Sequence, residues 1–212
     1  MLFSIVIPTY NNLEELRRCL AALDRLENQD FEVLVGVDGS TDGTRDFLES
    51  YAPNFSFYHL YHPGGVNQGR SATRNLALAQ LSGKYTLFLD SDMEAAPDLL
   101  ARHLEVLGQG DRVSVGSVQY RNAADNLWVR YTSERGVGKY AAGSAVPFHY
   151  FITPNTALPT RYWREVGGFD AAINRYGGED MELGYRIHQR FDPVFTYNPV
   201  AQVATTPPMT LK

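Results

Sequence analysis

The sequence has few of the features that mark several large protein classes. Its 212 residues include one cysteine, Cys19, so it can form neither an internal disulfide nor a zinc site built from cysteines, and we expect this thiol to pack as a small apolar group. No apolar run approaches the ~20 residues needed to cross a bilayer. Residues 1–7 lack the cationic start of a signal peptide. We therefore expect a cytoplasmic protein, for which peripheral contact with the inner face of a membrane stays open.

An excess of basic residues is also missing. The chain has 19 Lys and Arg against 24 Asp and Glu, a net charge of −5, which argues against a nucleic-acid partner. Hydrophobic residues make up 44% of the chain and aromatic residues 12%, which is enough to close a core. The length suits one domain.

Apolar runs alternate with helical patterns along most of the chain, which is typical of a parallel sheet covered by helices. Strands are predicted at 3–7, 31–37, 55–60, 85–89 and 113–120. Helices are predicted from Asn11 or Asn12 as a cap to residue 23, at 44–51, 71–81, 98–107 and 179–190, and starting near Thr160. Residues 121–150 do not follow the pattern and predict an irregular cover over the sheet.

Polar clusters follow three of the predicted strands. Pro8, Thr9 and Tyr10 come after the first, residues 38–43 after the second, and residues 90–92 after the fourth. Ligands of open α/β sheets bind at the carboxyl ends of strands, so we expect these three turns to converge on one crevice.

Asp90-Ser91-Asp92 places two carboxylates two residues apart at the end of a buried strand. Side chains at such positions of an extended chain point the same way, so both can face one hard cation whose shell a phosphate oxygen completes. Aspartates around a serine are also common turn formers, and both interpretations stay open.

Glu179-Asp180 follows Gly177-Gly178 and opens a predicted helix. Acids in a first helical turn complement the helix dipole, but a carboxylate in a partly closed crevice could instead take a proton from a hydroxyl. The spacing alone does not decide between the two.

Three more residues could contact a nucleotide. Asp38 is either a turn former or an acceptor for a base imide or ribose hydroxyl. Arg70 and Arg74 share one helix face, and they are either solvated or bind a pyrophosphate.

In combination these motifs closely resemble family 2 glycosyltransferases of the GT-A fold, a three-layer α/β/α arrangement with a mostly parallel central sheet. The motifs that carry the resemblance occur in the family's order between residue 3 and about 190: Ser4-Ile5-Val6-Ile7-Pro8-Thr9-Tyr10, Val37-Asp38-Gly39-Ser40, Arg74-Asn75, Asp90-Ser91-Asp92, Gly167-Gly168-Phe169-Asp170 and Gly178-Glu179-Asp180. The resemblance implies one domain, with a nucleotide-sugar-binding half (1–95) and an acceptor and catalytic-base half (96–212).

The activity that the resemblance implies is an inverting, single-displacement transfer from a nucleotide sugar, a UDP-sugar, with Mn²⁺ or Mg²⁺, to a hydroxyl of a glycan, glycolipid or other glycoconjugate. The leaving nucleoside diphosphate needs a cation, and the attacking hydroxyl must lose a proton, so one carboxylate site serves each end of the reaction.

The resemblance also implies roles for individual residues. The implied donor contacts are Pro8, Thr9, Tyr10, Asp38 at the base, Arg74 beside the nucleotide, and Asp90 with Ser91 near the ribose. Asp92, with Asp90, is implied as metal ligand, and Asp180, with Glu179 beside it, as catalytic base. We predict that Asn155, Trp163, Tyr176, Gly177 and Gly178 lie on the acceptor side.

Two departures from the family pattern bear on these roles. Val37 stands where the family usually has a first aspartate, and residues 203–206 contain no histidine where many members have a third metal ligand. His188, on a predicted helix, is interpreted as structural or exposed. Two other functions stay open: a sugar nucleotidyltransferase, although the Gly-rich phosphate loop of such enzymes is missing after Ile7, and a glycan- or nucleotide-binding module without turnover.

Overall fold

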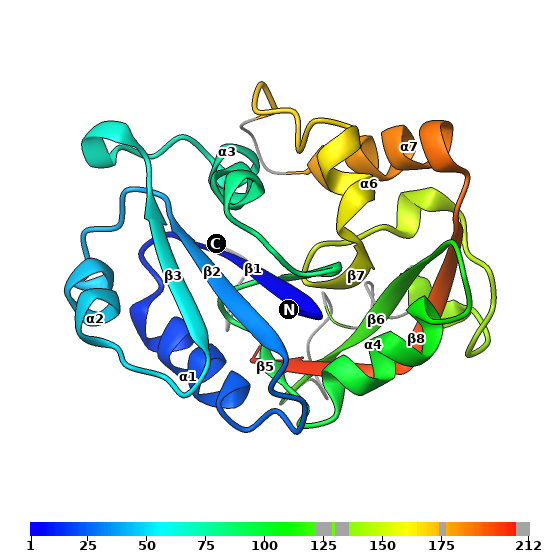
Figure 1. The fold of residues 1–212 in the computed structure, drawn as a ribbon, viewed down its shortest axis with the longest axis horizontal. Helices are drawn as coiled ribbons and strands as arrows, with labels where there is room; N and C mark the ends of the chain where they lie inside the picture. Colours follow the sequence, from blue (N-terminus) through cyan, green and yellow to red (C-terminus); the bar gives the residue numbers. More distant parts are fainter. Residues whose placement is uncertain (122–128, 130–135, 174–176, 207–212) are drawn as a thin grey trace.

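The computed structural model describes residues 1–121, 129, 136–173 and 177–206 (Figure 1). Its strands are β1 (Phe3–Thr9), β2 (Phe31–Val37), β3 (Ser56–Tyr61), β4 (Tyr85–Leu89), β5 (Glu94–Ala95), β6 (Arg112–Tyr120), β7 (Asn155–Pro159) and β8 (Val194–Thr205). Its helices are α1 (Leu13–Leu23), α2 (Thr44–Ser50), α3 (Arg70–Asn75), α4 (Leu99–Leu107), α6 (Thr160–Glu165) and α7 (Glu179–Phe191). Short 3₁₀ turns are η1 (Pro63–Gly65), η2 (Leu76–Ala79), η3 (Val137–Lys139) and η4 (Phe148–Tyr150).

The strands form one mixed sheet in the order β3-β2-β1-β4-β7-β6-β8-β5. The half formed by β3, β2, β1 and β4 is parallel, as the alternating pattern predicts. In the other half, β7 runs antiparallel to both of its neighbours, β6 and β8 are parallel, and β5 is antiparallel to β8. The predicted α/β class with a mostly parallel sheet is confirmed.

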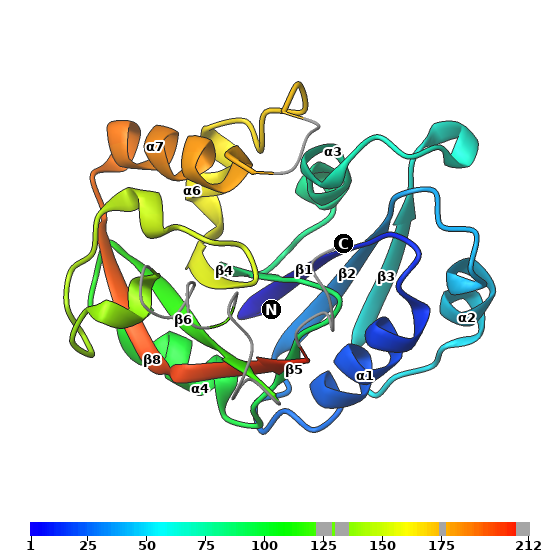
Figure 2. The ribbon, with the colours of Figure 1, turned by 180° about the vertical axis from the view of Figure 1, so that it is seen from behind.

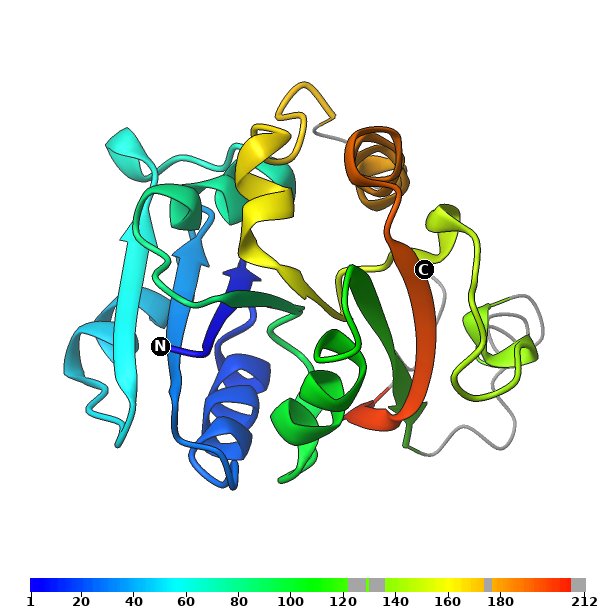
Figure 3. The ribbon, with the colours of Figure 1, turned by 45° about the vertical axis from the view of Figure 1, so that its right-hand side comes forward.

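Both faces of the sheet are covered by helices. Ile5 and Ile7 of β1 pack into one core cluster with α1 and α4, whereas Val6 between them packs into a second cluster with α6 and α7. This alternation follows from the two-residue period of a strand, and it buries both faces as in other parallel sheets. Figure 3 shows α1 and α4 on one side of the sheet and α3, α6 and α7 on the other. Seen from behind, α1 lies against β5 (Figure 2).

Cys19 lies in the first of these clusters and is fully buried, as predicted. Burial raises the pKa of its thiol, and the neighbouring Asp92 and Asp90 carboxylates raise it further, so the side chain stays protonated. It acts as a small apolar core residue.

The structure differs from the prediction at several elements. The helix expected over 71–81 is two pieces, α3 and then η2, and the strands β5, β7 and β8 are not among those predicted. β7 begins with Asn155 and Thr156, which do not give the apolar pattern of a core strand. The predicted irregular cover is confirmed for residues 136–150, which form η3, η4 and a single antiparallel bridge between Ala145 and Thr196, whereas residues 122–128 and 130–135 lie outside the described part.

The turns after β1 and β2 brace one another. The Asp38 backbone N–H donates to the Thr9 carbonyl at 2.9 Å. Asn11 or Asn12 is predicted to cap α1, and Asn12 does stand at the N-cap position, but its side chain makes no capping hydrogen bond. Asp42 supplies that bond instead, because its Oδ2 accepts the Leu13 N–H at 2.9 Å while its Oδ1 accepts the Thr44 N–H at 3.2 Å. Burial tends to raise the pKa of Asp42, but these hydrogen bonds outweigh it and hold the pKa below its usual value. One carboxylate therefore starts two helices and fixes the two turns together.

Candidate active site

Arg74 lies at the centre of a cluster of carboxylates. Its side chain is 1% exposed, and its Nη2 donates to Asp90 Oδ1 at 2.8 Å. Its Nη1 lies 3.9 Å from both Glu179 Oε1 and Asp180 Oδ1. The Nε and Nη1 atoms are buried and have no hydrogen-bond partner among the described residues. One buried guanidinium thus joins the acid after β4 to the acids that open α7.

The position of Arg74 depends on the docking of α3 against residues 168–173. Asn75 Nδ2 donates to the Phe169 carbonyl and Asn75 Oδ1 accepts the Phe169 N–H, both at 2.8 Å. Gly168 makes this approach possible, because its φ is +86° and a Cβ there would lie 2.6 Å from Asn75 Oδ1. Two motifs that are almost a hundred residues apart in the sequence therefore meet at the site.

Asp90, Ser91 and Asp92 follow β4, and each has a different hydrogen-bond partner. Ser91 Oγ accepts a hydrogen bond from Asn12 Nδ2 at 3.0 Å, and Asp92 Oδ2 accepts one from Thr205 Oγ1 at 3.1 Å. Burial raises the pKa of the Asp92 carboxyl and the charge of Asp90 raises it further, while the bond from Thr205 opposes the shift. Two like charges held close in a partly buried turn favour a cation between them.

The donor set of this turn fits a divalent metal that is shared with a phosphate ligand. Within the described residues, no group of three or more His, Cys, Asp or Glu side chains could hold a metal by itself. Mg²⁺ is commonly bound through one or two carboxylates with substrate phosphates and water, and Asp90 with Asp92 meets that description. Thr205 lies in the segment where many family members supply a histidine.

Asp180 and Glu179 form the first turn of α7. Gly178, with a φ of +96°, turns the chain into the helix in a conformation that a side chain would strain. Asp180 accepts the Thr153 backbone N–H at 3.2 Å and the Thr153 hydroxyl at 3.0 Å. Burial raises the pKa of Asp180, Arg74 opposes this, and Glu179 adds to it. A carboxylate with a raised pKa that is fixed by hydrogen bonds is suited to accept a proton.

Arg70 lies at the edge of the same cluster. Its side chain is 44% exposed, and its Nη1 lies 3.8 Å from Glu179 Oε1. The structure therefore separates the two arginines of α3, since Arg74 is buried among the carboxylates and Arg70 is at the surface.

The predicted nucleotide-contacting turns lie at the carboxyl ends of β1 and β2. Thr9 is buried and Tyr10 is 52% exposed. Asp38 is 5% exposed, and its oxygens accept the backbone N–H groups of Gln68 at 2.7 Å and Gly69 at 3.1 Å. Its carboxylate therefore holds the loop that leads into α3.

Two residues predicted on the acceptor side are core residues instead. Trp163 is fully buried, and its ring packs edge-to-face on Phe88 with centroids 4.9 Å apart, so it has no face for a sugar. Asn155 is also fully buried, and its amide bonds to His103, Ser117 and Ala201. The sequence pattern does not show that Trp163 and Asn155 belong to the core, because both lie close in the sequence to segments that do contribute to the site.

The other acceptor-side predictions have different outcomes. Gly177 and Gly178 are exposed directly before the Glu179-Asp180 turn, and Tyr176 lies outside the described residues. His188, interpreted as structural or exposed, is 38% exposed and stacks on Phe148 with ring centroids 5.3 Å apart.

A comparison of the sequence with models of protein families identifies the family of this chain. Residues 4–177, most of the chain, match the family described as Glycosyl transferase family 2. The chain belongs to this family. Validoxylamine A glucosyltransferase from Streptomyces hygroscopicus subsp. jinggangensis (strain 5008) is 32% identical over 224 residues, which cover 91% of this chain and 53% of the relative.

Two solved structures show that this family 2 chain has the GT-A fold. TarS 1-349 from S. aureus in complex with UDP-GlcNAc has a TM-score of 0.77 at 22% identity, covering 100% of this chain and 60% of that one. Mannosyltransferase PcManGT from Pyrobaculum calidifontis in complex with GDP-Man and Mn²⁺ has a TM-score of 0.74 at 20% identity, covering 98% and 57%. The chain thus spans about half to three fifths of the length of these proteins.

Sequence reasoning missed the residues that support the carboxylates of this glycosyltransferase chain. Thr153 and Thr205, which donate to Asp180 and Asp92, give no signal of their own, because an isolated threonine in a strand or loop is common. Asn12 was considered only as a helix cap, yet it donates to Ser91. The family motif marks the acids but not these donors.

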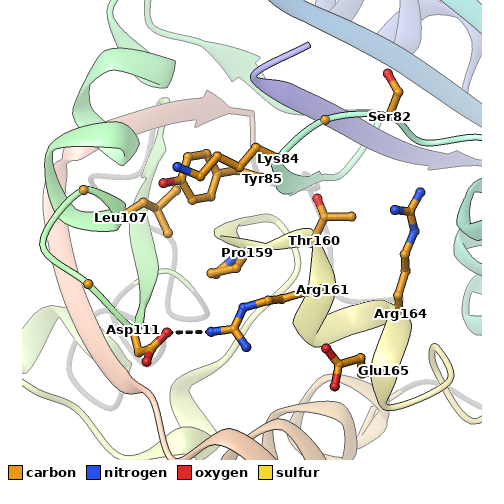
Figure 4. A pocket seen from close by; sticks show the side chains of 13 residues that line it. Ser82, Lys84, Tyr85, Leu107, Asp111, Pro159, Thr160, Arg161, Arg164 and Glu165 are labelled. Atoms are coloured by element: carbon orange, nitrogen blue, oxygen red, sulfur yellow. Dashed lines mark hydrogen bonds and ion pairs between the residues drawn. The ribbon is translucent and has the colours of Figure 1, made fainter.

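A separate cavity of about 820 Å³ lies at the other end of the sheet (Figure 4). It is lined by residues before β4, such as Lys84, and by α6, where Arg161 donates to Asp111 Oδ1 at 2.7 Å. None of the predicted site residues lines it. The candidate active site is the cluster of side chains around Arg74 near the carboxyl ends of β1, β2 and β4. None of the described helices is long and apolar enough to span a bilayer.

Proposed function

We propose that this chain transfers a sugar, with inversion at the anomeric carbon, from a UDP-sugar to a hydroxyl of a glycan, glycolipid or other glycoconjugate. The observation that carries the proposal is the cluster around Arg74, in which a buried guanidinium links Asp90 to Asp180. The acids that the two ends of a glycosyl transfer require lie on either side of a single arginine.

The residues after β4 would serve the donor. Asp90 and Asp92 would hold a divalent metal, which when bound neutralises charge on the leaving diphosphate. Tyr10, which directly follows β1 and is 52% exposed, would offer a ring for the nucleotide base. TarS in complex with UDP-GlcNAc and PcManGT in complex with GDP-Man and Mn²⁺ support a nucleoside-diphosphate sugar and a divalent cation as ligands.

The first turn of α7 would serve the acceptor. Asp180 takes the proton of the attacking hydroxyl as the acceptor oxygen bonds to the anomeric carbon. The bond from that carbon to the diphosphate oxygen breaks, and the nucleoside diphosphate leaves with the electron pair. Thr153 keeps the Asp180 carboxylate in place, and Arg74 favours its ionised form before the proton arrives. Glu179 is a buried neighbour of Asp180, and the positive charge of Arg74 also offsets the negative charge of Glu179.

A donor panel tests the proposal. UDP-glucose, UDP-galactose, UDP-GlcNAc and GDP-mannose are incubated with the chain and Mn²⁺ or Mg²⁺, and release of nucleoside diphosphate is measured. We expect metal-dependent release from at least one UDP-sugar, lost in Asp92→Ala and in Asp180→Asn. Full activity in both variants would overturn the roles, and metal-dependent UDP binding without release from any donor would favour a binding module.

A further inference from the structure

Helix α3, which carries Arg74, is too short to hold its own position. It has six residues, well below the ~12–15 at which an isolated helix becomes marginally stable in water. Its place therefore depends on the contacts of its side chains with neighbouring segments. Ser71 Oγ donates to the Ile173 carbonyl at 3.1 Å, in addition to the bonds between Asn75 and Phe169. A further set of contacts ties the helix to the end of β2.

That second set is built around His62, which directly follows β3. Its Nε2 lies 2.9 Å from Thr73 Oγ1 and 3.5 Å from Asp38 Oδ1, and all three side chains are buried. The Thr73 hydroxyl donates its one proton to the Gly69 carbonyl at 2.9 Å, so it can only accept from His62. The Asp38 carboxylate is also an acceptor, and we therefore assign the ring proton to Nε2. One buried N–H thus faces acceptors on α3 and at the end of β2.

The sheet and the loop before α3 reinforce this attachment. Asp38 accepts the backbone N–H groups of Gln68 and Gly69, the last two residues before the helix. Gly36 of β2 lets the helix approach the sheet closely, because a Cβ there would lie 2.7 Å from the Thr73 carbonyl oxygen. The start of α3 is therefore held by Asp38 and its middle by the contacts of Thr73.

The position of α3 decides where the charge of Arg74 lies. Arg74 directly follows Thr73, and its guanidinium donates to Asp90 at 2.8 Å and lies 3.9 Å from Asp180. A shift of the helix would move this buried positive charge away from the acids. The acids would then repel an anionic diphosphate more strongly, because the repulsion would no longer be offset. The attachment of α3 is thus linked to the binding of the donor.

We propose that His62 is a positioning residue for donor binding. Its contacts with Thr73 and Asp38 fix α3, and α3 in turn keeps Arg74 beside the carboxylates of the site. The inference rests on the proposed function and adds to its donor site a residue that the sequence motifs do not mark. His62 acts through the helix, so its loss should weaken binding of the diphosphate group whatever base the nucleotide carries.

Calorimetry with Mn²⁺ and either UDP or inorganic pyrophosphate tests this role. His62→Leu removes the N–H donor, and we expect it to weaken both ligands by a common factor of about ten, since a buried acceptor loses its partner. His62→Gln, whose amide nitrogen can donate in place of Nε2, should recover most of the affinity. The matched control is His59→Leu, because the Nδ1 of His59 on β3 is buried without a hydrogen-bond partner among the described residues.

Hydrogen exchange measured without ligand shows whether α3 itself is loosened. The backbone amides of residues 68–75 should exchange faster in His62→Leu than in wild type, and at nearly the wild-type rate in His62→Gln and His59→Leu. If His62→Leu does not fold, Thr73→Val breaks the same hydrogen bond with a side chain of the same shape and carries the same expectations.

The outcomes separate this inference from the proposed function. Unchanged affinity for both ligands in His62→Leu and Thr73→Val, with or without faster exchange, overturns the role of His62 and leaves the function standing. A loss for UDP alone also overturns it, because His62 would then act at the base. A wild-type chain that binds UDP but turns over no donor fails the proposed function, while the pyrophosphate comparison still decides the role of His62. A wild-type chain that binds neither ligand overturns both.

Discussion

Arg74 donates a hydrogen bond to Asp90 Oδ1 at 2.8 Å while its Nη1 lies 3.9 Å from Asp180 Oδ1. A buried cation is stable here because three carboxylates surround it, and the carboxylates tolerate one another because it is there. The carboxylate that follows β4 and the two carboxylates that open α7 therefore share one positive charge.

Replacement of Arg74 should shift the pH dependence of transfer. Arg74 lowers the pKa of Asp180, so in Arg74→Met this pKa rises and the base becomes protonated at higher pH. The acidic limb of the kcat/KM profile should then move up by about one pH unit, the effect of one close opposite charge. Arg74→Lys, which keeps the charge, should move it less. Arg70→Met is the control, since Arg70 is exposed and contacts Glu179. Superimposable profiles for wild type and Arg74→Met would show that Asp180 is not the titrating base.

Thr153 and Thr156 are both buried and lie three positions apart, so they offer a matched test of whether a threonine hydroxyl positions the proposed base, Asp180. Thr153→Val removes the hydroxyl that donates to Asp180 at 3.0 Å, whereas Thr156→Val removes a buried hydroxyl with no hydrogen-bond partner among the described residues. Thr153→Val should lower kcat/KM and cost about 1 kcal/mol of unfolding free energy. Thr156→Val should leave kcat unchanged and stability equal or higher. Steady-state kinetics and urea unfolding measure both, and equal effects of the two substitutions would exclude a special role for Thr153.

The parallel half of the fold could be predicted because its strands are apolar and end in turns rich in Asp and Gly. β1 and β2 are buried on both faces, so their sequences are nearly continuous apolar runs. β7 could not be predicted, because its Asn155 satisfies buried partners on three other segments, a role that only the tertiary structure creates. The acids of the site, in contrast, could be predicted, because their spacing after strands and glycines is a local feature of the sequence.

The contacts around those acids depend on long-range geometry. Trp163 lies on α6, which contacts α7, but its side chain is buried in the core, and an aromatic pattern alone does not tell a buried ring from an exposed one. Tyr185 gives the reverse case, since a tyrosine on an amphipathic helix is expected at the boundary of the core and lies half exposed. A helical wheel does not show that Gly184 admits η4 beside it.

Loss of the metal or of Asp92 should weaken donor binding in the same way. Asp92→Asn, or addition of EDTA to wild type, should reduce UDP binding by at least about tenfold, a loss typical even of groups that only orient metal ligands. Protons compete with the cation for carboxylates, and because burial and Asp90 raise the pKa of Asp92, binding should begin to fall at a higher pH than for an ordinary aspartate. Calorimetry with UDP and Mn²⁺ at several pH values measures this. Asp46→Asn, at an exposed position of α2, is the control. UDP affinity that is the same with and without metal would contradict the assignment.

His103 should make the fold less stable in mild acid. Its ring is fully buried between Ser114 and Asn155, and burial lowers its pKa to about 4. The unfolded chain, with a histidine pKa of about 6.5, binds the proton more readily, so stability from this residue is complete above that pH and is lost as the pH falls toward 4. Between pH 7 and pH 5 the loss is about 2 kcal/mol. Urea unfolding at both pH values should show a smaller difference for His103→Gln than for wild type, whereas His149→Gln, at an exposed position, should match wild type. An unchanged difference in His103→Gln would mean that the carboxylates alone set the acid sensitivity of the fold.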